Sequence, residues 1–79
     1  MSKAKRQKAH AKRRMRQRFG IMLTNNDIQE MVRKIQSGEM RAVDKQSNRV
    51  TVFETDFKGE RMHVVYDKHR KTIVTALYP

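Results

Sequence analysis

Residues 49–78 read RVTVFETDFKGERMHVVYDKHRKTIVTALY, and this stretch decides the fold. It is rich in Val, Thr, Phe, Tyr and Ile, which fit the pleated and half-buried surface of a strand. Polar and apolar residues alternate along most of it, as they do when one face of a strand is buried. Including the residues just before it, the pattern predicts four strands, at 40–46, 49–57, 61–67 and 71–78.

The links between these strands are short. Ser47-Asn48, Lys58-Gly59 and the segment from Asp67 to Arg70 supply the polar and glycine residues that turns require. Links of two to four residues join neighbouring antiparallel strands rather than parallel ones. The sequence therefore predicts one antiparallel meander.

Residues 2–19, ahead of the strands, contain neither Gly nor Pro and are rich in Ala, Lys, Arg and Gln, which favour a helix. Ala11, Met15, Phe19 and Met22 recur every three or four residues and form a narrow apolar stripe. The stripe is missing before about Ala9, so we expect residues 1–9 to form a basic, flexible arm. Gly20 ends the helix.

A second helix is expected after Thr24. Thr24 can cap its N-terminus, and Asp27 stands three residues on, at the position that closes a capping box. Apolar residues follow with helical spacing, and Gly38 supplies a C-terminal stop. They are Ile28, Met31, Val32 and Ile35.

Together these elements predict an α+β domain over residues 10–79. Two N-terminal helices pack on one face of a four-stranded antiparallel meander sheet, because neither layer can bury its apolar side alone.

Composition excludes several classes of protein. The chain has 79 residues and no Cys, which leaves room for one core and excludes disulfides and a thiolate nucleophile. Three His residues without clustered carboxylates do not indicate a metal site, and we expect no cofactor. No apolar run is long enough to cross a membrane, so we expect a cytoplasmic protein without a membrane partner.

Charge is the most informative property. The formal net charge is +11, and residues 1–20 hold nine basic residues and no acidic one. A charge this localised indicates a polyanionic partner, and RNA or a ribosome is the favoured one. The candidate phosphate contacts in this segment are Lys3, Lys5, Arg6, Lys8, Lys12, Arg13 and Arg16.

His10, Arg14 and Arg18 are spaced four residues apart and share one edge of the first helix. An imidazole can move a proton near neutral pH, and guanidinium groups can bind a phosphate and stabilise developing charge. The spacing is compatible with RNA cleavage. From the spacing alone, however, the favoured interpretation is that His10 is one more polar residue in a polar helix.

Three positions in the predicted sheet leave alternatives open. Alternation groups Tyr66 with Met62 and Val64, and Thr75 with Ile73 and Leu77. Thr75 is then either a hydrogen-bonded core residue or a hydroxyl that faces a substrate. Phe53 and Phe57 share one strand face and could stack on bases, but a chain with five aromatic residues favours them as core.

Residues 10–21 read HAKRRMRQRFGI and resemble the opening H-A-x-x-R-M-x-x-R-x-G-I of a family of small uncharacterised domains. The ending is also similar, with Val65-Tyr66-Asp67 before a turn, then Ile73-Val74-Thr75 and a terminal Tyr78-Pro79. That family is similar to the barnase, EndoU, colicin tRNase and RelE-type ribonuclease fold group.

The resemblance implies a metal-independent site built from His10, Arg14 and Arg18 with Tyr66 and Thr75. The implied reaction is attack of a ribose 2′-hydroxyl on the adjacent phosphate. Arg49 corresponds to a further basic position that would contact the nucleic acid. The arm before His10 departs from the family pattern.

The sequence thus favours a metal-independent endoribonuclease that is toxin-like and of bacterial or phage type. A toxin of this kind would have a cognate inhibitor as a partner. A non-catalytic RNA- or ribosome-binding module is the alternative from the same residues. A third hypothesis is an interaction protein that docks its basic helix on an acidic partner protein.

Overall fold

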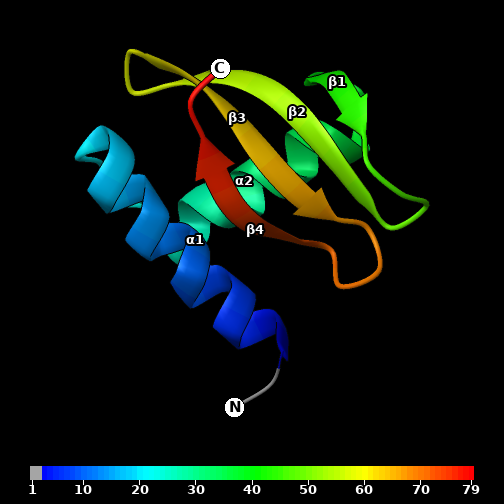
Figure 1. Ribbon diagram of the computed structural model, residues 1–79, viewed down its shortest axis with the longest axis horizontal. Coiled ribbons are helices and arrows are strands. Elements are labelled where there is room, and N and C mark those ends of the chain that lie inside the picture. The colour runs from blue at the N-terminus through cyan, green and yellow to red at the C-terminus, as the bar shows by residue number, and fades with distance from the viewer. Residues whose placement is uncertain (1–2) are drawn as a thin grey trace.

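The computed structural model describes residues 3–79, so Met1 and Ser2 of the predicted arm lie outside the described residues. Two helices precede four strands: α1 (Lys3–Phe19), α2 (Asn25–Gln36), β1 (Arg41–Lys45), β2 (Val50–Phe57), β3 (Glu60–Asp67) and β4 (Thr72–Leu77). The strands form one antiparallel sheet in the order β1-β2-β3-β4 (Figure 1). The predicted α+β fold with a meander sheet is confirmed.

The β2–β3 hairpin is the tightest link in the sheet. Phe57 pairs with Glu60, so the loop consists of Lys58 and Gly59 alone. Both residues have positive φ, 50° and 81°, as a two-residue turn that matches the right-handed twist of its strands requires. This break lies where the sequence predicts it.

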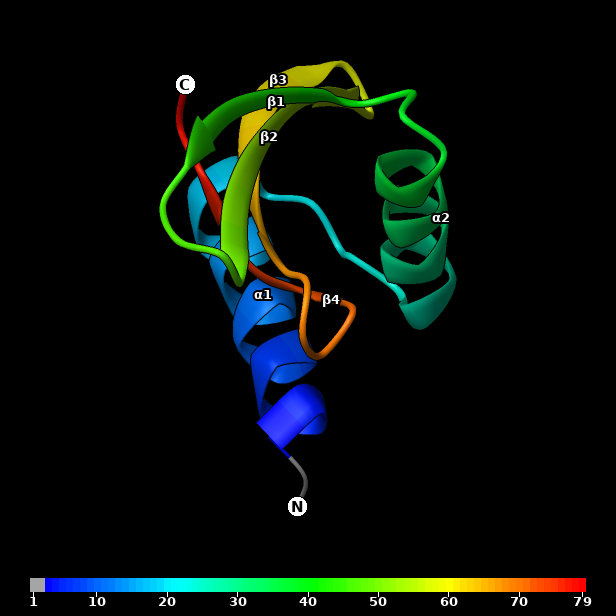
Figure 2. The same cartoon turned by 90° about the vertical axis from the view of Figure 1, so that its right-hand side faces the viewer.

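Both helices bury their apolar residues in one core. Figure 2 shows the sheet curving toward α2, while α1 runs along β4. Ala11 and Met15 of α1 and Ile28, Met31 and Ile35 of α2 belong to the same buried cluster. The cluster also contains Met62, Val64 and Tyr66, which alternate along β3 and so share one face of the sheet.

The α2 N-terminus has the predicted capping box. The Asp27 N–H donates to Thr24 Oγ1 at 3.1 Å, and the Thr24 N–H donates to Asp27 Oδ2 at 3.0 Å. These two bonds satisfy backbone donors that the first helical turn leaves unpaired. At the other end, Gly38 adopts a φ of 82° just after the helix.

Helix α1 begins at Lys3, earlier than the apolar stripe predicts. Residues 3–9 are therefore part of the helix and not an arm that precedes it. This part of the helix also makes a tertiary contact, because the side-chain amide of Gln7 donates to Asp67 Oδ2 at 3.0 Å. The spacing of apolar residues cannot reveal a polar contact of this kind.

Along β4 the side chains do not alternate strictly between the two faces of the sheet. A bulge between Val65 and Tyr66 of β3 pairs Tyr66 with Ile73 and Val65 with Thr75. Neighbouring residues of β3 point to opposite faces, so Ile73 and Thr75 also lie on opposite faces. The prediction that Ile73 and Thr75 share a face is wrong.

Candidate functional site

Helix α1 divides its side chains between the core and the surface. Ala11 and Met15 are fully buried against the sheet. Five basic residues of the helix are exposed, and they define what we call the α1 basic face: Lys3, Lys5, Arg6, Arg13 and Arg16. The other four basic residues of the helix, Lys8, Lys12, Arg14 and Arg18, are half-buried along its flanks.

The α1 basic face carries little compensating charge. The helix has no acidic residue of its own. Arg6, Arg13 and Arg16 have no acidic partner among residues 3–79. Unpaired guanidinium groups on one helix side produce a positive field that attracts polyanions.

Arg14 and Arg18 differ in their surroundings. The Arg18 guanidinium donates to the backbone carbonyl of Ala76 at 2.7 Å, and the Tyr78 hydroxyl donates to the carbonyl of Arg18. The rings of Phe19 and Tyr78 are also in contact, with centroids 4.9 Å apart. Arg18 therefore helps to fasten α1 to the end of β4, whereas Arg14 donates to Gln17 of its own helix, at 3.4 Å.

His10 is half-buried at the edge of a shallow hollow. Lys3, Arg6 and Gln7 from the helix line this hollow, together with Val74 of β4. Two cationic side chains, Lys3 and Arg6, therefore accompany the imidazole. They are not Arg14 and Arg18, the two residues that the family resemblance implies.

Tyr66 and Thr75 do not meet. Tyr66 points to the core face, where Gln36 of α2 donates to its hydroxyl at 3.5 Å. Thr75 pairs with Val65 and points to the opposite face. The implied set of five residues is therefore divided by the sheet, and one substrate phosphate cannot contact both Tyr66 and Thr75.

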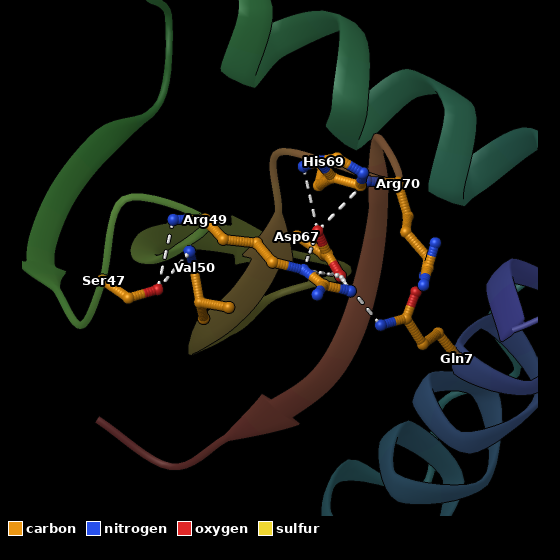
Figure 3. Close-up of polar contacts among 7 residues, drawn as sticks. All are labelled: Gln7, Ser47, Arg49, Val50, Asp67, His69 and Arg70. Atoms are coloured by element: carbon orange, nitrogen blue, oxygen red, sulfur yellow. Dashed lines mark hydrogen bonds and ion pairs between the residues drawn. The ribbon is translucent and has the colours of Figure 1, made fainter.

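The guanidinium of Arg49 forms an ion pair with the carboxylate of Asp67. Its Nε lies 3.1 Å from both carboxylate oxygens of Asp67, and its Nη2 lies 3.0 Å from Oδ2 (Figure 3). This pair raises the pKa of Arg49 above its ordinary value. A phosphate would have to compete with Asp67 for this guanidinium, so Arg49 differs from the unpaired cations of α1.

Asp67 is the centre of a polar cluster that sequence reasoning missed. Its side chain is buried and joins three segments (Figure 3). Besides Arg49, Asp67 Oδ2 accepts from Gln7, and Oδ1 accepts from the backbone N–H groups of His69 and Arg70 at 2.9 and 3.0 Å. The Arg49 bonds, and then those of Gln7 and Arg70, hold the pKa of Asp67 well below its usual range despite its burial. The signal available in the sequence was an Asp directly before a turn, where it can accept from backbone N–H groups two and three residues on.

Residues 3–79 contain neither a metal-binding cluster nor a membrane-spanning helix. No group of three or more His, Asp or Glu side chains is arranged to hold a metal ion in this part of the chain. No helix between Lys3 and Pro79 is long and apolar enough to span a bilayer.

Comparison of the chain with models of protein families, with curated proteins and with solved structures finds no match. The resemblance to the ribonuclease fold group therefore stays a prediction from the quoted residues.

Proposed function

We propose that the protein binds RNA and that the α1 basic face contacts the phosphates. The observation that carries this proposal is a 17-residue helix with cations exposed on one side, no acidic residue and its apolar side already buried. A helix that served solubility alone would gain from acidic residues four positions from its basic ones. A helix that bound membranes would need a free apolar face, and that of α1 lies against β4.

The α1 basic face matches the chemistry of a nucleic-acid backbone. Each phosphate that a Lys or Arg neutralises releases condensed counterions, which favours binding at low salt. Contacts of this kind position the protein but do not read sequence. The proposal is therefore RNA binding in which α1 supplies affinity.

Arg13 and Arg16 provide the test. A double variant, Arg13→Gln with Arg16→Gln, is expected to bind a labelled oligoribonucleotide roughly five- to twentyfold more weakly than wild type, because two phosphate contacts are lost. Fluorescence anisotropy at fixed salt measures this change.

The matched control is Arg41→Gln with Lys45→Gln. Both residues are exposed on β1, so the control removes the same charge from another surface. If the two double variants lose affinity equally, net charge and not the α1 basic face drives binding.

RNA cleavage is the second candidate, and the hollow beside His10 favours it. His10 would take the proton of a ribose 2′-hydroxyl, and O2′ would form a bond to the adjacent phosphorus as the bond from phosphorus to O5′ breaks. The products are a 2′,3′-cyclic phosphate and a 5′-hydroxyl, and the departing O5′ takes its proton from solvent water. Lys3 and Arg6, which line the same hollow, would stabilise the charge on the phosphate.

Cleavage is tested by incubating total RNA with the protein in EDTA and resolving the products on a denaturing gel. Wild type is expected to give discrete products and His10→Ala none. His69→Ala is the matched control, because His69 is exposed in the β3–β4 turn. Intact RNA with wild type, or equal cutting by the His10 variant, would remove this candidate and leave RNA binding in place.

A further inference from the structure

Two adjoining hollows lie between α2 and the β3–β4 turn. Lys8 of α1 and Val32 of α2 line the first. Phe53, Tyr66 and Lys68 line the second, which has a volume of about 420 Å³. Gln36 and Lys71 line both, so the two hollows adjoin, and we call them together the α2 groove.

The charge that lines the α2 groove has one sign. Neither hollow is lined by Asp or Glu. Lys8, Lys68 and Lys71 have no acidic partner among the described residues, whereas Arg33, also at the groove, is paired with Glu30 and Glu39. Three unpaired ammonium groups in sequence along a groove favour an extended anion with several charges.

The floor of the second hollow is aromatic. Phe53 is half-buried, and the ring of Tyr66 meets it at 77°, with centroids 6.1 Å apart. This edge-to-face contact is a favourable arrangement for aromatic rings and fixes the orientation of Phe53. An aromatic ring beside cations is the combination that single-stranded nucleic acids use, since a base can stack while its phosphates are neutralised.

Hydrogen-bonding groups accompany the aromatic ring. Tyr66 is only 5% exposed, and its hydroxyl oxygen accepts from the Gln36 amide. Tyr66 and Gln36 both line the second hollow. A phenol hydroxyl and a side-chain amide can hydrogen-bond the edge of an unstacked nucleobase.

We propose that the α2 groove binds single-stranded RNA. Phe53 stacks on a base, Tyr66 and Gln36 bond to its edge, and Lys8, Lys71 and Lys68 contact successive phosphates. Lys8 belongs to α1, so the groove continues the path of a strand that the α1 basic face binds. The inference rests on the proposed RNA binding and adds that the bound strand is unpaired, because a duplex hides the faces of its bases.

Lys71 offers an unusually clean test, because its backbone has a φ of 54°, which Gly adopts without strain. Lys71→Gly is expected to weaken binding of a single-stranded oligoribonucleotide roughly fivefold while the melting temperature does not fall. Lys58→Gly is the matched control, because Lys58 is also exposed with positive φ, at 50°, but lies in the other hairpin and away from the groove. This control is expected to change affinity less than twofold.

Phe53→Leu tests the stacking contact. Leu keeps an apolar side chain on the core but has no ring, so affinity for the single strand is expected to fall roughly tenfold. Affinity for a duplex of the same sequence is expected to stay within twofold of wild type. Equal losses for single strand and duplex would overturn the base contact.

Failure of this inference and failure of RNA binding give different results. If Lys71→Gly and Phe53→Leu bind the single strand as wild type does, while Arg13→Gln with Arg16→Gln does not, the α2 groove is not the path and α1 binding stands. If wild type binds no RNA at low salt, both proposals fall.

Discussion

Asp67 shows how one side chain can join distant parts of a small protein. Asp67 is 1% exposed, yet its carboxylate holds a helix, the loop after β1 and the turn after β3. A buried charge is tolerated only when hydrogen bonds and an opposite charge replace water. Arg49 and the backbone N–H groups supply that replacement.

Asp67→Asn is expected to lower the free energy of unfolding by about 2–3 kcal/mol, because hydrogen bonds to a charged group are lost or weakened and Arg49 loses its counter-ion. Urea denaturation at neutral pH measures the loss. Asp44→Asn, at an exposed position of β1, is expected to change stability by less than about 0.5 kcal/mol. A similar effect at both positions would contradict the role given to Asp67.

The same carboxylate gives the stability a dependence on pH. The pKa of Asp67 is lowered in the folded state, so its contribution is complete above the unfolded-state value near about 3.9 and is lost as pH falls below it toward the folded-state value. Wild type is therefore expected to lose stability between about pH 4 and pH 2 more steeply than Asp67→Asn. Parallel acid-unfolding curves for the two proteins would contradict this.

The side-chain contacts of Asp67 could not be predicted from the sequence, because its partners Arg49 and Gln7 are far from it along the chain. Arg49 lies 18 residues from Asp67, and Gln7 lies 60 residues away. Polar contacts of this range follow no local pattern. The division of Tyr66 from Thr75 also escaped prediction, because an alternating pattern gives no sign of a bulge.

Helix α2 shows the opposite case, in which local spacing was sufficient. The capping box depends only on Thr24 and a residue three positions on, and the β2–β3 hairpin depends only on Lys58-Gly59. Each feature depends on no more than four consecutive residues, so it can be predicted from the sequence without knowledge of distant contacts. Helix α1 lies between the two cases. Ala11 and Met15 of its predicted stripe are buried, but Met22 is exposed, and Gln7 contacts an Asp 60 residues away.

Thr24→Ala is expected to cost about 1 kcal/mol of stability, since the side-chain acceptor at the α2 N-terminus is lost. Thermal or urea unfolding measures it. Asn26→Ala provides the control, because Asn26 is exposed in the first turn of the same helix and Ala favours helices. The control is expected to be neutral or slightly stabilising, and an equal loss at both positions would argue against the cap.

The molecule as a whole separates its charge from its core. Residues 1–20 carry nine basic residues and no acidic one, whereas the remaining 59 residues carry ten basic and eight acidic residues. The apolar side of α1 is buried against the sheet, whereas its basic side is exposed and is the side that we propose contacts a partner. Lys8 of the same helix lines the α2 groove, so in our proposal one strand of RNA contacts both surfaces.

The salt dependence of RNA binding tests the central claim most directly. Affinity of wild type for a labelled single-stranded oligoribonucleotide would be measured between about 50 mM and about 200 mM salt. The account predicts that log K falls linearly with log salt, with a slope steeper than about −2, and that Arg13→Gln with Arg16→Gln makes the slope shallower by about 1.4, or about 0.7 for each phosphate contact. A flat dependence in wild type, or an unchanged slope in the double variant, would contradict RNA binding by α1.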